Sequence, residues 1–148
     1  MTTPTDIALA RFDEGYACSQ SVFSAYAPLF NLDPELALRI AAPFGGGMGL
    51  LGEVCGAVTG AFMVLGLKAG NTLAQDRASK ERAYDLARAF AQRFRARHGS
   101  ILCRELLGCA IDTAEGLQAA RARGLFIELC PRLVQDSAEI VAELLEEG

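Results

Sequence analysis

The stretch that decides the fold is residues 50–67, LLGEVCGAVTGAFMVLGL, in which Glu53 is the one charged residue. Such a stretch predicts a central helix that is buried on all sides, because it has no polar face to turn toward water. Gly52, Gly56 and Gly60 recur every four residues, so they would share a helix face that a second helix can approach closely. The length approaches that of a membrane span, but Glu53 and the glycines favour a buried helix in a soluble domain.

The segments on both sides of this stretch have amphipathic patterns that predict a shell of further helices. Asp33 and Pro34 form a helix-start signal, with Asp33 as the cap and Pro34 in the first turn. The glycine-rich residues 45–49, GGGMG, predict a loop. The expected helices cover residues 6–16, 18–30, 34–42, 73–98, 99–108, 114–123 and 125–146, the last with a restart at Pro131.

Length and composition predict one domain that spans residues 1–148. The chain has 148 residues, 51% of them hydrophobic, and no linker or internal repeat. We therefore expect an all-α fold, a compact helical bundle around a glycine-rich apolar central helix. The polar segment 1–6 lacks the features of a secretion signal, which predicts a cytoplasmic location.

The charge pattern argues against nucleic acid as a partner. The formal net charge is −4, which gives no general attraction to polyanions. Half of the fourteen basic residues fall in the expected helix 73–98, interleaved with Asp76, Glu81 and Asp85. This pattern is typical of a solvated helix face, with an anionic partner as the alternative.

The five cysteines are the candidates for chemistry: Cys18, Cys55, Cys103, Cys109 and Cys130. No CxxC pair occurs, and a reducing cytoplasm favours catalytic, redox-sensing or metal-binding thiols over structural disulfides. All except Cys109 lie at or near an expected helix start, where the local positive potential favours the thiolate. For Cys103 the expected cap is Ser100. Cys109 follows a helix-ending glycine, and we expect it to be a bystander.

Two other patterns predict no site. Residues 47–52 match the spacing GxGxxG of a dinucleotide-binding turn, but the preceding segment predicts a helix where that motif requires a strand. His98, the single histidine, falls at an expected helix end beside Gly99, where a positive charge is favourable. No Ser-His-Asp set or carboxylate pair is evident.

The cysteine surroundings resemble the C_GCAxxG_C_C family, small bacterial and archaeal proteins described as "putative redox-active". The resemblance covers nearly the whole chain and rests on the segments GYACSQ (15–20), FGGGMG (44–49), GEVCGAVTG (52–60), CRELLG (103–108) and Cys130-Pro131. It implies that Cys18, Cys55, Cys103 and Cys130 are the functional set, with Cys109 outside it.

Three functions stay open at this point. The first is thiol-disulfide chemistry with a redox partner protein or a small molecule and no cofactor. Cys18–Cys55 with Cys103–Cys130 is then one of three pairings that four cysteines allow. The second is a zinc or iron–sulfur site with Cys18, Cys55, Cys103 and Cys130 as ligands. The third is a non-catalytic helical partner protein, with a homodimer as one form.

Overall fold

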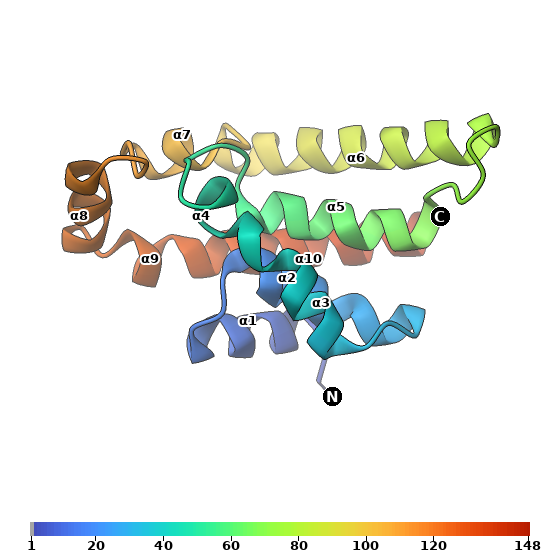
Figure 1. Ribbon diagram of the computed structural model, residues 1–148, viewed down its shortest axis with the longest axis horizontal. Helices are drawn as coiled ribbons and strands as arrows, with labels where there is room; N and C mark the ends of the chain where they lie inside the picture. The colour runs from blue at the N-terminus through green and yellow to red at the C-terminus, as the bar shows by residue number, and fades with distance from the viewer. Residues whose placement is uncertain (1) are drawn as a thin grey trace.

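The computed structural model describes residues 2–148 and confirms the all-α fold (Figure 1). Met1, the first residue of the expected domain 1–148, lies outside the described residues. Within them the one β-type pairing is an isolated bridge between Val54 and Leu102. The helices are α1 (Pro4–Glu14), α2 (Cys18–Tyr26), η1 (Ala27–Phe30), α3 (Pro34–Ala41), η2 (Ala42–Phe44), α4 (Gly45–Met48), α5 (Gly56–Ala69), α6 (Arg77–His98), α7 (Cys103–Leu107), α8 (Ala114–Ala122), α9 (Leu125–Glu128) and α10 (Cys130–Glu147).

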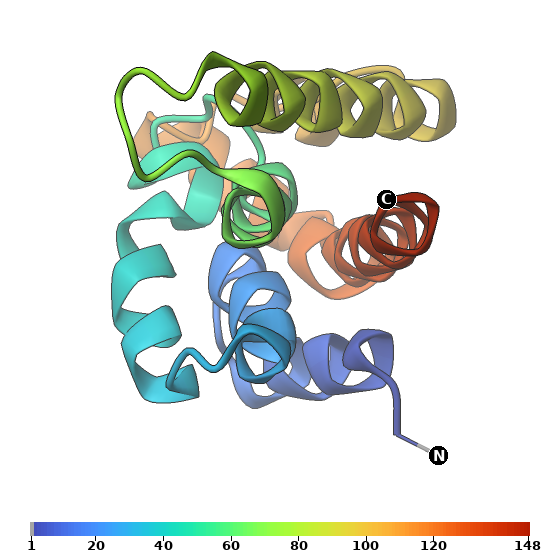
Figure 2. The ribbon, with the colours of Figure 1, turned by 90° about the vertical axis from the view of Figure 1, so that its right-hand side faces the viewer.

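Helix α5 is the central element, as its apolar sequence predicts. Figure 2 looks along the bundle and shows α5 between α6, α10 and α2, and each of these three helices contacts it. Val58, Ala61 and Val64 are fully buried. The predicted burial on all sides is wrong for the C-terminal turn of α5, because residues 66–68 are exposed. In residues 2–148 we find no helix with the length and apolar character that crossing a membrane requires.

The prediction that the central helix begins near Leu50 was wrong, because α5 begins at Gly56. Gly49, Leu50 and Gly52 all have positive φ, a left-handed backbone that cannot continue a right-handed helix. Gly52 therefore does not share a helix face with Gly56 and Gly60. Glu53 lies outside the helix on an exposed segment, where its carboxylate pairs with Arg104 at 3.1 Å.

Helices α2 and α5 approach until their backbones touch. A Cβ atom on Gly60 would lie 2.7 Å from the Ser19 carbonyl oxygen, and one on Gly56 would lie 3.0 Å from the Ser19 nitrogen. The Ser19 hydroxyl is buried and donates to the Ala41 carbonyl oxygen at 2.8 Å, which attaches α2 to the end of α3. Glycine at positions 56 and 60 is thus a steric requirement of this contact.

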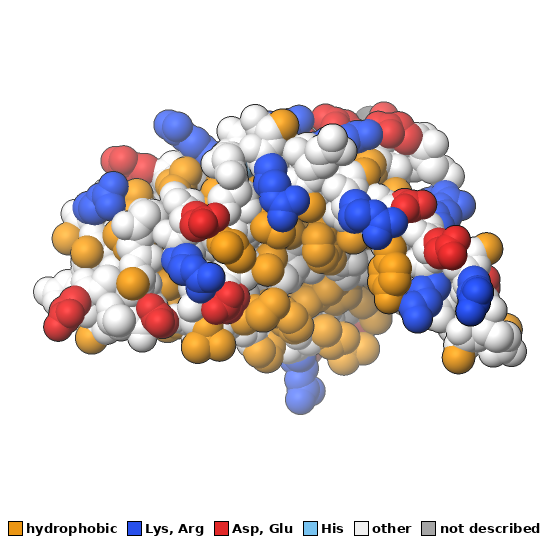
Figure 3. All heavy atoms as spheres, turned by 90° about the horizontal axis from the view of Figure 1, so that it is seen from above, with side chains coloured by type: hydrophobic (Ala, Val, Ile, Leu, Met, Phe, Trp, Pro, Cys, Tyr) orange, Lys and Arg blue, Asp and Glu red, His pale blue; other side chains and the backbone are white. Residues whose placement is uncertain are grey.

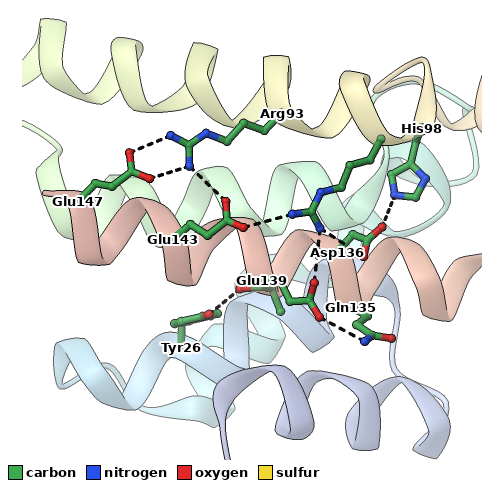
Figure 4. Close-up of polar contacts among 10 residues, drawn as sticks. Tyr26, Arg93, His98, Gln135, Asp136, Glu139, Glu143 and Glu147 are labelled. Atoms are coloured by element: carbon green, nitrogen blue, oxygen red, sulfur yellow. Dashed lines mark hydrogen bonds and ion pairs between the residues drawn. The ribbon is translucent and has the colours of Figure 1, made fainter.

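Helices α6 and α10 run side by side and are joined by ion pairs (Figure 4). Arg93 contacts Glu143 and Glu147, and Arg97 reaches Glu139 and Glu143. Part of the basic charge expected on a solvated face is therefore neutralised within the molecule. In Figure 3, blue and red side chains interleave on the face seen from above, which shows no continuous basic patch.

Several helix boundaries differ from those expected. The segment 18–30 divides at Tyr26, because Pro28 has no N–H with which to continue the α-helix. Helix α6 begins at Arg77 rather than Leu73. Asp76 caps it, because its carboxylate accepts a hydrogen bond from the Ser79 N–H. Asp33 caps α3 as predicted. The last helical segment does restart, at Cys130 beside Pro131.

The α2–α5 contact predicts opposite effects of two alanine substitutions in the same helix. Gly60→Ala places a methyl group against the Ser19 carbonyl and should lower the free energy of unfolding by about 2 kcal/mol. Gly66→Ala meets no atom within 4 Å and should raise it by about 0.5–1 kcal/mol, since alanine favours the helix. Urea unfolding followed by circular dichroism measures both. Equal effects of the two substitutions would contradict the close contact.

Candidate functional site

Cys18, Cys55, Cys103 and Cys130 all line one cavity of about 130 Å³. They are separated by up to 112 positions in sequence (130 − 18), so only the packed bundle brings them together. The rest of the lining is apolar side chains and glycines, which are Phe12, Gly46, Gly47, Leu50, Gly56, Leu106, Leu107, Phe126 and Leu133. Of these, the apolar side chains carry no sequence pattern that sets them apart from ordinary core residues.

Each of the four cysteines lies at the start of a helix, as expected. Cys18, Cys103 and Cys130 are the first residues of α2, α7 and α10, and Cys55 is the residue that precedes α5. Free N–H groups at a helix start create a positive potential that stabilises a thiolate. The expected cap of α7 was wrong by two residues. Leu102 occupies that position, while the Ser100 hydroxyl accepts from the Leu102 N–H.

An isolated antiparallel bridge places Cys55 and Cys103 on the same side. The Cys55 N–H donates to the Ile101 carbonyl oxygen at 2.8 Å, and the Cys103 N–H donates to the Glu53 carbonyl oxygen at 2.6 Å. Cys55 is thus opposite Ile101, two residues before Cys103. Because residues two apart in an extended chain share a face, both thiols point to the cavity side.

The glycine-rich loop closes over Cys103. Gly46, Gly47 and Gly49 all have positive φ, so the short helix α4 retains the loop character that the sequence predicts. Gly47 is buried, and a Cβ atom on it would lie 2.7 Å from the Cys103 Cβ. Its carbonyl oxygen accepts from the Glu53 N–H at 2.9 Å, which ties the loop to the bridge segment.

Cys18 and Cys130 both line the cavity, and each shifts the pKa of the other. Interaction with the Cys18 thiol lowers the pKa of Cys130 below its ordinary value, although burial opposes the shift. Interaction with Cys130 raises the pKa of Cys18 well above its ordinary value, and burial adds to that rise. Of the two thiols, Cys130 is therefore the easier to deprotonate.

Cys55 and Cys103 stay protonated at neutral pH. Burial raises the pKa of Cys55 to about 11, although the Ala57 and Val58 N–H groups at the start of α5 act in the opposite direction. Burial also raises the pKa of Cys103 to about 12, and the nearby Cys55 and Cys130 sulfurs add to it. Two of the four thiols are thus neutral groups of the cavity wall.

The structure does not form a metal cage around these thiols. The four sulfurs lie close enough to influence one another's charge. Even so, nowhere in residues 2–148 do three or more His, Cys, Asp or Glu side chains converge as ligands of one metal ion. A four-thiolate zinc or iron–sulfur site requires its sulfurs to surround a common centre. Among residues 2–148 the four sulfurs do not meet that requirement in this arrangement.

The remaining sequence candidates lie outside the cavity. Cys109 is half-buried, and its sulfur lies 3.5 Å from the Arg123 guanidinium. His98 closes α6 beside the Asp136 carboxylate at 2.8 Å, as Figure 4 shows. The GxGxxG spacing at 47–52 follows helical segments α3 and η2, so the strand that a dinucleotide-binding turn requires is not there.

The interaction between the two thiols predicts how substitution of Cys18 changes the pKa of Cys130. Cys18→Ala removes the group that lowers this pKa and should raise it, whereas Cys18→Ser retains a polar hydrogen and should raise it less. The pKa is measured from the pH dependence of Cys130 alkylation by iodoacetamide, quantified by peptide mass spectrometry. Cys109→Ala is the matched control and should leave the profile unchanged. An unchanged profile in Cys18→Ala would refute the pairing.

A comparison with family models finds one match. Residues 16–144 match the model described as "Putative redox-active protein (C_GCAxxG_C_C)". No curated protein and no solved structure matches the chain. The match spans most of the chain and includes all four cavity cysteines. The chain therefore belongs to the C_GCAxxG_C_C family.

Proposed function

We propose that this chain is a thiol-based redox protein whose reactive pair is Cys18 and Cys130. The family description points to redox activity. The observation that carries the thiol mechanism is that Cys18 and Cys130 line one cavity, where their interaction lowers the pKa of Cys130 and raises that of Cys18. Such a couple supplies a nucleophile and a resolving thiol together.

The proposed reaction is thiol-disulfide exchange. The Cys130 thiolate attacks one sulfur of a substrate disulfide, a mixed disulfide forms, and one substrate thiolate leaves. Cys18 then loses its proton and attacks the Cys130 sulfur, which forms the Cys18–Cys130 disulfide and releases the second substrate thiolate. The two protons of the protein thiols end on the two substrate thiols, so two electrons pass from protein to substrate. In a reducing cytoplasm, the location we propose, a redox partner would then restore the thiols.

Cys55 and Cys103 have a different part in this proposal. Their pKa values are raised mainly by burial, whereas the pKa of Cys18 is raised first by its interaction with Cys130. We therefore assign the resolving role to Cys18, and Cys55 and Cys103 act as neutral walls and weak S–H donors beside the reacting sulfur. The proposal thus narrows the four-cysteine catalytic set to one pair. It also differs from the pairing of Cys18 with Cys55 and Cys103 with Cys130 considered from the sequence.

The test is to oxidise the reduced protein in dithiothreitol buffers of increasing potential without oxygen. We expect the free thiol count to fall by two, and peptide mapping to find Cys18 joined to Cys130. Cys130→Ala should abolish this loss. Cys109→Ala, which removes a thiol outside the cavity, should retain it.

Two results would replace the proposal with one of its alternatives. Protein purified without oxygen that holds stoichiometric zinc or iron, released by Cys18→Ala, would support the metal site. No thiol loss at any potential, with unchanged stability in the cavity cysteine variants, would support a non-catalytic partner protein.

A further inference from the structure

The walls of the cysteine cavity are apolar. Apart from the thiols and glycine backbone, the lining that residues 2–148 provide consists of Phe12, Leu50, Leu106, Leu107, Phe126 and Leu133, with no charged side chain. An ion that enters such a space loses its hydration. The Cys130 thiolate repels an anion, and its attraction for a cation is offset by the cost of desolvating that cation. The walls therefore select against charged disulfides such as glutathione disulfide.

The volume of the cavity limits the size of what it can hold. It measures about 130 Å³, and an apolar protein cavity of about 150 Å³ binds benzene. A compound of about six non-hydrogen atoms is thus near the upper limit. Diethyl disulfide has this size, whereas a peptide disulfide does not.

The same walls favour a disulfide over a hydroperoxide as the oxidant. Cleavage of a hydroperoxide by a thiolate leaves an alkoxide, a strong base whose charge requires strong hydrogen-bond donors in the site. The side-chain donors that line this cavity are thiols, which are weak donors. Cleavage of a disulfide leaves a thiolate, a much weaker base, so it needs less stabilisation.

Leu50 lies between the cavity and solvent. Its side chain lines the cavity and is 44% exposed, and it packs against Gly46 of the glycine-rich loop. Its φ is +64°, a backbone conformation in which glycine is unstrained and leucine is not. In the described part of the chain, Leu50 is the one lining residue that is exposed, so we infer that the entrance to the cavity passes this apolar side chain.

We propose that the substrate of the Cys18–Cys130 couple is a small uncharged disulfide, admitted past Leu50. This inference rests on the proposed function and specifies its substrate class. The reaction is the exchange described above: one substrate S–S bond breaks, one protein S–S bond forms, and two uncharged thiols leave the cavity.

The first experiment compares three disulfides on the reduced protein: diethyl disulfide, cystamine, which adds an ammonium group to each end of the same chain, and glutathione disulfide. The rate of protein thiol loss is followed by mass spectrometry and divided by each disulfide's rate with free N-acetylcysteine, which removes intrinsic reactivity. We expect the normalised rate for diethyl disulfide to exceed that for glutathione disulfide by about 100-fold, since a charge is costly to desolvate there. It should also exceed that for cystamine, by less, because the Cys130 thiolate attracts an ammonium group.

The second experiment opens the entrance. Leu50→Gly suits the left-handed backbone and should reduce the preference for diethyl disulfide over glutathione disulfide by about tenfold, or about 1.4 kcal/mol. Leu51→Gly is the matched control, because Leu51 is exposed on the same loop but does not line the cavity. It should leave the preference unchanged.

The outcomes separate this inference from the function on which it rests. Equal normalised rates for the three disulfides, in protein that still forms Cys18–Cys130 in dithiothreitol buffers, overturn the substrate class alone. Failure of the couple to form in those buffers overturns the proposed function itself. If Leu50→Gly does not fold, the rates of the three disulfides with the unsubstituted protein still test the substrate class.

Discussion

The backbone contact between α2 and α5 is the constraint on which the rest of the structure depends. Gly56 and Gly60 bring the start of α2 against α5, so a Cβ atom on Gly56 would also meet the Cys18 side chain at 3.3 Å. This contact places Cys18 beside the start of α5. The bridge between Val54 and Leu102 then adds Cys103 to the same cavity. The cysteine site is therefore a direct product of how closely two helices pack.

Burial determines how the four thiols share charge. A thiolate in an apolar cavity lacks hydration, and a second thiolate would add repulsion to that cost, so the site favours a single negative charge. Interaction with Cys18 makes Cys130 the thiol that takes this charge most readily, while Cys55 and Cys103 keep their protons. Four cysteines at four helix starts thus differ in protonation state, because the groups around each thiol differ.

The sequence predicted the helical class, the central apolar segment and the four cysteines of the cavity, because composition, periodicity and helix-start signals are local properties. It did not predict the start of α5 at Gly56, since leucine rarely adopts the left-handed backbone found at Leu50. The bridge that aligns Cys55 with Cys103 joins segments about fifty residues apart and leaves no local pattern. The pairing of Cys18 with Cys130 was equally hidden, because it depends on the packing of α10 against α2.

The most direct test of the account is a pair of crystal structures from one crystal form, one fully reduced and one oxidised without damage to the crystal. The account predicts that the Sγ atoms of Cys18 and Cys130 are the closest thiol pair in the reduced form and are covalently joined in the oxidised form. A disulfide between Cys55 and Cys103, with Cys18 and Cys130 still free, would contradict it. So would four sulfurs around one metal ion.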